Sequence, residues 1–449
     1  MTSLNETPRA NRLHIGIFGK RNSGKSSLIN ALTGQNIALV STHAGTTTDP
    51  VYKSMELHPI GPVVFIDTAG FDDQGDLGQL RVEKTGEVIK KTDVAILVFD
   101  AEAIAYALEI DSTTGSTGNS RFALTSSLQY ELDWNEKLQS ANIPIIYVLN
   151  KVDVLFGEDA MIEQINNLIV AEFGAIPILV SATEKEGLTA IRTMLSSSVP
   201  ESVRRERIIN DLVRPGDVVM LVMPQDIQAP KGRLILPQVQ TIRELLDGKC
   251  TVVCVTADGM DQALAILPSL PEASLNETTR QIPAVIITDS QCFELVYKRK
   301  PIGTMLTSFS VLLAASKGDL DELVLGASAI ERLSPNSKVL IAEACTHAPL
   351  TEDIGREKLP RMLRKRMDQQ FGEGSGQKLS IQIVAGVDFP KDLSSYDLVI
   401  HCGACMFNRK YMMSRISQAQ LQHVPITNYG VVLAYLTGIL DKINLPIAD

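Results

Sequence analysis

The sequence has few aromatic residues and no long apolar run. Aromatic residues make up 5% of the 449 residues, with a single tryptophan. No apolar stretch approaches the roughly 20 residues that a membrane span needs. Met1 to Arg12 is polar and lacks the apolar core of a signal peptide. We therefore expect a cytoplasmic protein that has no membrane partner.

Cysteine is scarce, and negative charge exceeds positive charge. Six cysteines in a chain of this length do not indicate a disulfide framework, and Cys250, Cys254 and Cys292 lie in or beside apolar runs, which favours buried thiols in a reducing compartment. The formal net charge of -10 opposes nonspecific attraction to nucleic acid, so we expect no nucleic-acid partner. The basic segment from Arg356 to Arg366 is a solvated helix face or, alternatively, a docking surface for an acidic partner.

A glycine-rich loop follows the first predicted strand, His14 to Phe18. The loop reads Gly19-Lys20-Arg21-Asn22-Ser23-Gly24-Lys25-Ser26-Ser27 and leads into a predicted helix, which is the context of a Walker A loop. Its backbone N–H groups surround phosphates, Lys25 reaches the β- and γ-phosphates, and the Ser26 hydroxyl ligates Mg²⁺. The predicted contacts with the nucleotide also include Gly19, Asn22, Ser23, Gly24 and Ser27.

Three further motifs occur in the order that is typical of a GTPase. They are Gly45 to Asp49, Asp67 to Gly70, and Asn150 to Asp153. Asp67 would hold Mg²⁺ through water, Thr47 would complete the metal shell, and Gly70 would offer its N–H to the γ-phosphate. Phe71 stands where a Ras-like enzyme carries a water-positioning glutamine. Intrinsic GTP hydrolysis should therefore be slow.

The last of these motifs selects the base. Asp153 accepts two hydrogen bonds from an edge of guanine that adenine lacks, so it favours GTP over ATP. Asn150 and Lys151 belong to the same motif, and Ser181 and Ala182 close the base pocket. Together, these motifs predict a guanine-nucleotide domain with Mg²⁺ as its metal.

Cysteine and histidine follow two predicted strands in the last third of the chain. One strand, Lys338 to Ala342, leads to Cys345 and His347, and another leads to His401, Cys402 and Cys405. The carboxyl ends of parallel strands meet at one edge of a sheet, so we expect these five side chains to converge. They fit either a zinc site or an iron-sulfur cluster with one exchangeable position, and a chance pair of buried thiols is the remaining alternative. The run from Met406 to Ser417 reads as a helix whose N-terminus favours thiolate.

The nucleotide motifs resemble those of the GTPases related to the tRNA-modifying GTPase. In that class, the asparagine matching Asn22 binds a potassium ion near the phosphates, so the resemblance implies K⁺ as a further cofactor. A simple turn residue is the alternative interpretation of Asn22.

A GTPase domain followed by Cys-x-His and His-Cys-x-x-Cys resembles the FeFe-hydrogenase maturation GTPases, the HydF family, across essentially the whole chain. The resemblance implies a 4Fe-4S cluster on Cys345, Cys402 and Cys405. His347 and His401 are then candidates for the fourth ligand or for groups beside the cluster. It also implies a scaffold that carries a transient diiron precursor to the FeFe-hydrogenase apoprotein. The two radical-SAM maturation enzymes would be its partners, and the middle domain would form a homodimer.

The predicted fold class is α/β, with three consecutive α/β domains. The first is a P-loop GTPase fold, and the other two are smaller parallel-sheet Rossmann-like units. The predicted divisions are a polar tail at 1–13, a GTP-binding domain at 14–200, a linker at 201–215, a dimerisation domain at 216–298 and an iron-sulfur cluster-binding domain at 299–449. A strand from Met305 to Phe309 is expected to open the last domain, and the polar run at 111–120 reads as a surface insertion.

Two other functions compete with a GTPase scaffold for hydrogenase maturation. The first is an RNA-modification GTPase with a structural metal site, which the net negative charge opposes. The second is a redox enzyme that uses GTP only for regulation. Broad visible absorption of anaerobically purified protein would separate an iron-sulfur cluster from zinc.

Overall fold

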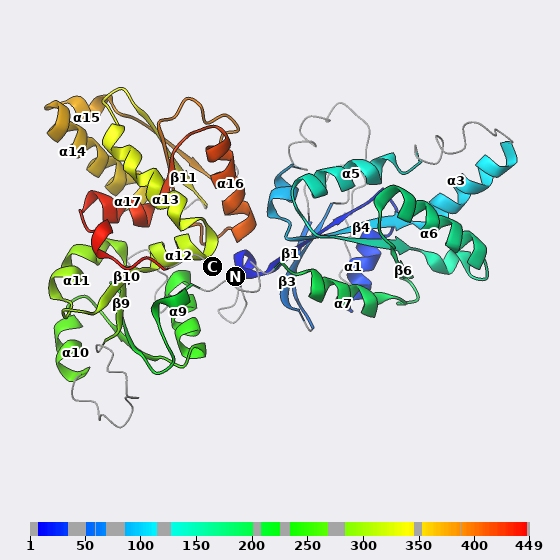
Figure 1. Cartoon of the computed structure of the whole chain (residues 1–449), viewed down its shortest axis with the longest axis horizontal. Helices are drawn as coiled ribbons and strands as arrows, with labels where there is room; N and C mark the ends of the chain where they lie inside the picture. The colour runs from blue at the N-terminus through cyan, green and yellow to red at the C-terminus, as the bar shows by residue number, and fades with distance from the viewer. Residues whose placement is uncertain are drawn as a thin grey trace, which may run out of the picture. The chain divides into compact units, whose positions relative to one another are not determined.

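The structure, a computed structural model, has an α/β architecture in each of two compact units, residues 1–205 and 206–449 (Figure 1). It describes residues 8–34, 51–58, 60–68, 86–114, 127–200, 208–224, 234–267, 283–344, 353–386 and 388–446. No helix in these ranges is both long and apolar enough to cross a membrane.

The first unit is a six-stranded sheet in the order β2-β3-β1-β4-β5-β6. Its strands are β1 (Leu13–Phe18), β2 (Val51–Leu57), β3 (Gly61–Asp67), β4 (Val94–Asp100), β5 (Ile145–Asn150) and β6 (Ile178–Val180). Only β2 pairs antiparallel, against β3. The central β1 and β4 are buried along their whole length because helices cover both faces of the sheet.

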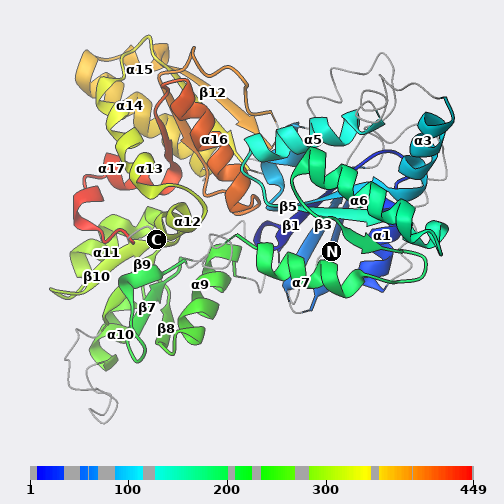
Figure 2. The same cartoon turned by 45° about the vertical axis from the view of Figure 1, so that its right-hand side comes forward.

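Helices form the two outer layers of the described part of this unit (Figures 1 and 2). One face packs against α1 (Lys25–Thr33) and α7 (Leu188–Ser198), and the other against α3 (Ala101–Thr114), α5 (Gln129–Ser140) and α6 (Asp159–Phe173). Helix α3 corrects one prediction, because residues 111–114 of the expected polar insertion continue it. The polar residues in this last turn have only slightly lower helix propensity than alanine, so they do not end the helix. Residues 115–120 lie outside the described residues.

The second unit contains two four-stranded parallel sheets. The first has the order β10-β9-β7-β8 and consists of β7 (Val218–Val222), β8 (Thr251–Val255), β9 (Val285–Thr288) and β10 (Met305–Ser308). The prediction that the strand near Met305 opens the last domain is wrong, because β10 pairs with β9 in the register Met305↔Val285. The helices of this sheet are α9 (Leu236–Asp247), α10 (Met260–Ile266) and α11 (Phe293–Arg299).

The second of these sheets has the order β12-β11-β13-β14. Its strands are β11 (Lys338–Glu343), β12 (Ser380–Ala385), β13 (Leu398–His401) and β14 (Ile426–Asn428), all parallel. The helices around it are α13 (Leu320–Ala327), α14 (Leu359–Phe371), α15 (Ser375–Lys378), α16 (Arg409–Leu421) and α17 (Tyr429–Leu436). The chain leaves β11 toward β12 and returns to its other side at β13, so the topological switch point lies between β11 and β13.

The two sheets of this unit share one apolar core. Helix α12 (Phe309–Lys317) is buried along most of its length, and its Val311 joins a cluster that contains Met220 of one sheet and Leu340 of the other. The backbone of Asn444 donates to Leu306 O at 2.7 Å, and its side chain accepts from Leu306 N. The C-terminal segment is thereby fixed to β10 of the neighbouring sheet.

Candidate functional site: a nucleotide pocket and a cysteine-bearing switch point

The loop between β1 and α1 has a backbone shape that depends on two glycines. Gly19 has a φ of +141°, and a Cβ there would lie 2.4 Å from Val98 O. Gly24 has a φ of +86°, and its Cβ would lie 2.2 Å from Asn150 Nδ2. Asn22 is also left-handed, with a φ of 64°. Any larger residue at Gly19 or Gly24 would clash with the neighbouring strand or the base-recognition segment.

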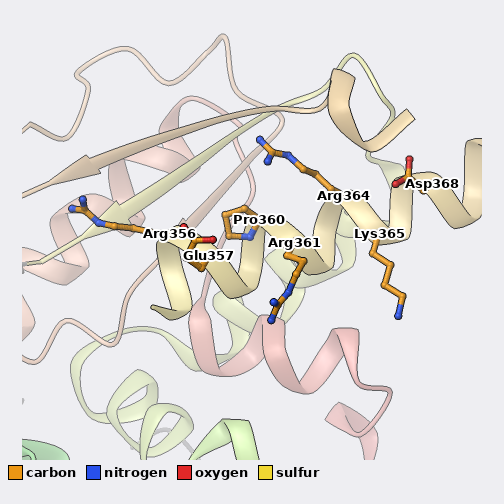
Figure 3. Close-up of a pocket in the computed structure, with 7 residues that line it drawn as sticks. All are labelled: Arg356, Glu357, Pro360, Arg361, Arg364, Lys365 and Asp368. Atoms are coloured by element: carbon orange, nitrogen blue, oxygen red, sulfur yellow. The ribbon is translucent and has the colours of Figure 1, made fainter. Parts of the chain in front are cut away.

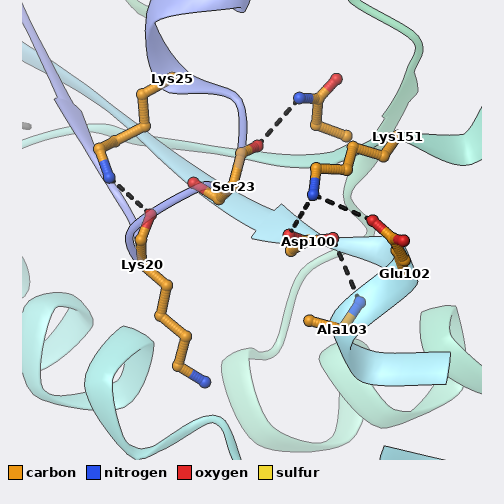
Figure 4. Close-up of polar contacts among 8 residues, drawn as sticks. Lys20, Ser23, Lys25, Asp100, Glu102, Ala103 and Lys151 are labelled. Carbon is orange, nitrogen blue, oxygen red and sulfur yellow. Dashed lines mark hydrogen bonds and ion pairs between the residues drawn. The ribbon is translucent and has the colours of Figure 1, made fainter. Parts of the chain in front are cut away.

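Lys25 and Ser26 stand at the start of α1 with their polar atoms turned toward the loop and β3. Lys25 is 4% exposed, and its ammonium donates to the carbonyl oxygens of Gly19 and Lys20 at 2.6 Å each. Figure 4 shows the lysine lying along the loop. The Ser26 hydroxyl donates to Asp67 Oδ2 at 2.8 Å. These hard oxygen donors, Ser26 at the start of α1 and Asp67 at the end of β3, fit Mg²⁺.

Asn150 ties the phosphate loop to the base-recognition segments. Its Nδ2 donates to Ser23 O at 2.9 Å, and its Oδ1 accepts from Ala182 N at 3.2 Å. The side chain is 2% exposed. One amide therefore fixes the relative positions of three loops from distant parts of the chain.

Asp153 has one carboxylate oxygen engaged and one available. Oδ2 accepts from the Thr183 hydroxyl at 3.2 Å, while the buried Oδ1 has no hydrogen-bond partner among the described residues. Thr183 in turn contacts Ser181 Oγ at 3.0 Å. An acceptor that is buried without a donor is costly, so the pocket is suited to a ligand that brings N–H groups.

Three ion pairs, made by two lysines, support this pocket, and the sequence motifs identify none of their acidic partners. Lys151 is left-handed, and its ammonium pairs with Asp100 at 2.7 Å and Glu102 at 3.2 Å (Figure 4). Lys20 pairs with the buried Glu131 of α5 at 3.4 Å, and its ammonium also contacts Ser127 O. Burial raises the pKa of the Glu131 carboxyl, and the charge of Lys20 opposes that rise.

The strands that precede the two cysteine motifs, β11 and β13, end at the same edge of their sheet. Ala342 pairs with His401, and Ala344 N donates to Cys402 Sγ at 3.0 Å. Ala344 directly precedes Cys345, which lies outside the described residues, as do His347, Thr47 and Gly70. Within the described residues, no group of three or more Cys, His, Asp or Glu side chains is close enough to hold a metal.

The loop from Cys402 to Cys405 is held in a tight turn. Ala404 has a φ of 53° and is 2% exposed, and Phe407 N donates to Ala404 O at 3.0 Å. Helix α16 begins only at Arg409, later than predicted, because the Asn408 side chain accepts from Tyr411 N and caps it. Burial raises the pKa of the Cys402 thiol to about 11, against which the N–H groups of Ala404 and Ala344 act. A cation or metal beside the sulfur would favour the thiolate.

His401 is the last residue of β13, not a loop residue. Its Nδ1 lies 2.9 Å from Cys402 O, and Arg415 Nη1 lies 2.8 Å from its Nε2. The guanidinium can only donate, so Nε2 is the acceptor and Nδ1 carries the proton. The ring is fully buried, and burial together with the charge of Arg415 lowers its pKa to about 3. The histidine is therefore neutral, with both nitrogens engaged by the protein.

The basic segment forms a groove along the start of α14, shown in Figure 3. Its lining consists of Arg356, Glu357, Pro360, Arg361, Arg364, Lys365 and Asp368. Arg356 already pairs with the buried Glu343 at 2.8 Å. Arg364 leaves the helix on the opposite side from Arg361 and Lys365 (Figure 3). The cations therefore do not converge on one ligand, which favours the solvated helix face over a docking surface.

The fold and the nucleotide pocket define a P-loop GTPase. A family model described as 50S ribosome-binding GTPase matches residues 14–151. Models described as the hydrogen maturase F dimerization domain and tetramerization domain match residues 208–318 and 321–445. The chain belongs to the hydrogen maturase F (HydF) family, and it carries the domains named for self-association in that family.

Curated relatives match part of this chain. The tRNA modification GTPase MnmE of Chromobacterium violaceum is 31% identical over 214 residues, which are 46% of this chain and 40% of that protein. GTPase Der of Wolinella succinogenes is 42% identical over 100 residues, which are 22% of this chain and 21% of that protein. This chain thus spans less than half the length of either relative. The crystal structure of a probable GTP-binding protein engB has a TM-score of 0.30 and 22% identity, covering 43% of this chain and 100% of that chain.

Proposed function

We propose that this chain is a GTP-hydrolysing scaffold for FeFe-hydrogenase maturation, with a 4Fe-4S cluster on Cys345, Cys402 and Cys405. It would carry the diiron precursor and transfer it to the apo-hydrogenase. The observation that supports the cluster is the hydrogen bond from Ala344 N to Cys402 Sγ, because it joins Cys402 to the residue directly before Cys345, across the switch point of the sheet. The GTPase domain and the family membership support the rest.

The nucleotide side of the proposal assigns roles to the loop residues. Lys25 would leave the carbonyl oxygens of Gly19 and Lys20 and bind the β- and γ-phosphates, with the backbone from Asn22 to Ser27 around them. Ser26, Asp67 and Thr47 would hold Mg²⁺, and Gly70 would donate to the γ-phosphate. Asp153 would bind guanine with Asn150, Lys151, Ser181 and Ala182 around the base.

The rate and its ion dependence are part of the proposal. With Phe71 following the Asp67 to Gly70 motif, hydrolysis would be slow. Asn22 is an exposed, left-handed residue of the phosphate loop, and a K⁺ ion bound beside it would accelerate hydrolysis. Equal rates in potassium and sodium salts would contradict this role of Asn22.

The cluster would supply iron with an exchangeable coordination site. Cys402 and Cys405 would contribute two thiolates and Cys345 the third. Because both nitrogens of His401 are engaged by the protein, His401 would act beside the cluster and not as its fourth ligand. His347 keeps both roles in the proposal, as fourth ligand or as neighbour of the cluster.

The partners in the proposal follow from family membership. They are a second copy of this chain, the FeFe-hydrogenase apoprotein and the two radical-SAM maturation enzymes, all in the cytoplasm. The dimerisation and cluster domains keep their proposed roles, but β10 (Met305–Ser308) belongs to the dimerisation domain, so the boundary between the two lies beyond Ser308 and not at residue 299.

The test is anaerobic reconstitution of the full chain with iron and sulfide. Wild-type protein should bind iron and show broad visible absorption, and Cys402→Ser should lose most of both. Cys254→Ser is the matched control, because Cys254, contrary to the prediction of a buried thiol, is an exposed cysteine of β8 in the other sheet. Equal iron content in the two variants would contradict the cluster, and failure of loaded wild-type protein to activate apo-hydrogenase would contradict the scaffold role.

A further inference from the structure

The cysteine-bearing half of the second unit contains a buried arginine that forms no salt bridge with a carboxylate among the described residues. Arg415 lies in the middle of α16 and is 3% exposed. Its polar neighbours are His401 Nε2, at 2.8 Å from Nη1, and Gly386 O, which Nη2 contacts. The buried Nε has no hydrogen-bond partner in the described part of the chain. Each of these neighbours is a neutral acceptor, so no polar partner of Arg415 in the described part of the chain neutralises its positive charge.

Three aromatic rings surround the guanidinium. The centroids of the Phe389, Phe407 and Tyr411 rings lie 4.5, 4.6 and 5.0 Å from its central carbon. Such contacts stabilise a cation by about 0.5–2 kcal/mol each. Removing a charge from water costs several kcal/mol, so buried charges in proteins are normally paired or bound to metals. The rings orient Arg415, but they do not neutralise its charge. A negatively charged group beside the guanidinium would therefore be stabilised.

Arg415 connects directly to the loop that carries the two cysteines. It fixes Nε2 of His401 as an acceptor, so Nδ1 donates to Cys402 O. Phe407, one of the three rings, is two residues beyond Cys405, and its backbone N–H donates to Ala404 O. The guanidinium thus determines the tautomer of His401 and packs against Phe407, whose backbone closes the turn of the Cys402–Cys405 loop.

We propose that Arg415 is a positioning residue of the cysteine site and supplies the fixed positive charge that balances an anionic, thiolate-bound iron-sulfur cluster. This inference rests on the proposed cluster. A cluster held by thiolates is negatively charged, and a nearby cation favours the reduced state, which is more negative still. Arg415 therefore raises the cluster's reduction potential and slows the loss of iron.

Three variants of the full chain separate the charge from the geometry. Arg415→Met removes the charge and keeps an apolar side chain among the rings. Arg415→Lys keeps the charge but loses the planar guanidinium, whose two terminal nitrogens reach His401 and Gly386. Arg366→Gln is the matched control, because Arg366 is an arginine of the same half that pairs with Glu331 on the surface. Each protein is reconstituted anaerobically.

Two readouts are independent of hydrogenase activation. The first is the midpoint potential from a redox titration followed by electron paramagnetic resonance, and the second is the rise in Tm on reconstitution. Relative to wild type, Arg415→Met should have a more negative potential, a smaller rise in Tm and several-fold faster loss of iron to a chelator. Arg415→Lys should keep the potential near wild type but lose iron faster, and Arg366→Gln should match wild type in every measurement.

The results distinguish this inference from the proposed function. If wild-type protein binds no cluster, the proposed function fails and the inference fails with it. If wild-type protein binds a cluster and Arg415→Met has the same potential and the same iron loss, only the inference is overturned. If Arg415→Met does not fold, Arg415→Lys decides the question: a potential clearly more negative than that of wild type overturns the charge role, and a retained potential supports it.

Discussion

The side-chain amide of Asn150, at the end of β5, donates to the backbone carbonyl of Ser23 in the phosphate loop at 2.9 Å. The two residues are 127 positions apart in the chain. The same side chain accepts from Ala182 N. Asn150 therefore holds the loops of the pocket together, whereas Asp153 of the same motif is the residue predicted to select guanine.

Replacing Asn150 should weaken GTP binding more than it weakens the fold. Asn150→Ala leaves the buried Ser23 carbonyl and Ala182 N–H without partners, which costs about 1–3 kcal/mol per group. We expect GTP affinity to fall by about tenfold to a hundredfold, on the scale of 1.4 kcal/mol per factor of ten. Calorimetric titration would measure this. Asn167→Ala, on the exposed side of α6, is the control and should bind GTP like wild type.

Asp153 should determine base specificity. In Asp153→Asn the new amide offers a donor in place of one carboxylate oxygen, which suits the carbonyl of xanthine. Affinity should shift from GTP toward the xanthine nucleotide, with the loss for GTP exceeding tenfold. Competition binding with both nucleotides tests this. Unchanged preference for GTP would remove Asp153 from the base pocket, despite its buried Oδ1 without a partner in the described residues.

The sequence predicts where strands form better than it predicts which strands pair or which side chains meet. The strand before the Walker A loop and the strand from Lys338 to Ala342 are confirmed as β1 and β11, because short apolar runs between turns fix them locally. The assignment of Met305 to the last domain is wrong, since the pairing of β10 with β9 depends on contacts beyond any local pattern. Arg415 was missed for the same reason: nothing in its own segment shows that α16 places it against His401.

Glu131 should make stability depend on pH. Burial raises its pKa in the folded state, so the folded protein binds this proton more tightly than the unfolded chain does. Stability from this group is present at low pH and is lost as pH rises through the unfolded pKa to the raised folded pKa. Glu131→Gln should therefore raise the Tm of the first unit at pH 7.

The advantage of Glu131→Gln should shrink as the pH falls below the raised folded pKa of the wild-type carboxyl, since that carboxyl is then neutral too. Calorimetric melting curves between pH 4 and 8 would measure it. Glu136→Gln, on the exposed side of the same helix, is the control and should show no such trend. A constant Tm difference at every pH would contradict the role of burial at Glu131.

Lys25 should be essential for GTP hydrolysis and irrelevant to iron content. Its ammonium has two carbonyl partners in the loop, and its removal takes away the only side-chain cation that the Walker A pattern directs to the β- and γ-phosphates. Lys25→Ala should lower the rate of GTP hydrolysis at least a hundredfold, measured by phosphate release. Iron and sulfide per chain after reconstitution should equal wild type, because the nucleotide pocket and the cysteines belong to different compact units. A parallel loss of iron would show that the two sites are coupled.

The cysteines and His401 should respond differently to substitution. A thiolate that binds iron has no equivalent in serine, so Cys402→Ser and Cys405→Ser should each lose most of the iron. His401→Ala should keep most of it, because both ring nitrogens serve protein groups, Cys402 O and Arg415. Loss of the His401 ring removes the hydrogen bond to Cys402 O and leaves Arg415 without one of its acceptors. The electron paramagnetic resonance signal of the cluster should therefore change although the iron remains.

Added imidazole or cyanide is the second half of this test. If one iron of the cluster has an exchangeable position, the wild-type signal should change when either ligand is added, and it should change in His401→Ala as well. The control is Cys254→Ser, whose signal should behave as in wild type because Cys254 lies on β8. Complete loss of iron in His401→Ala, together with a wild-type signal that no added ligand alters, would instead make His401 the fourth ligand. The neutral ring between Cys402 and Arg415 would then have to turn and give up one of its two hydrogen bonds when iron binds.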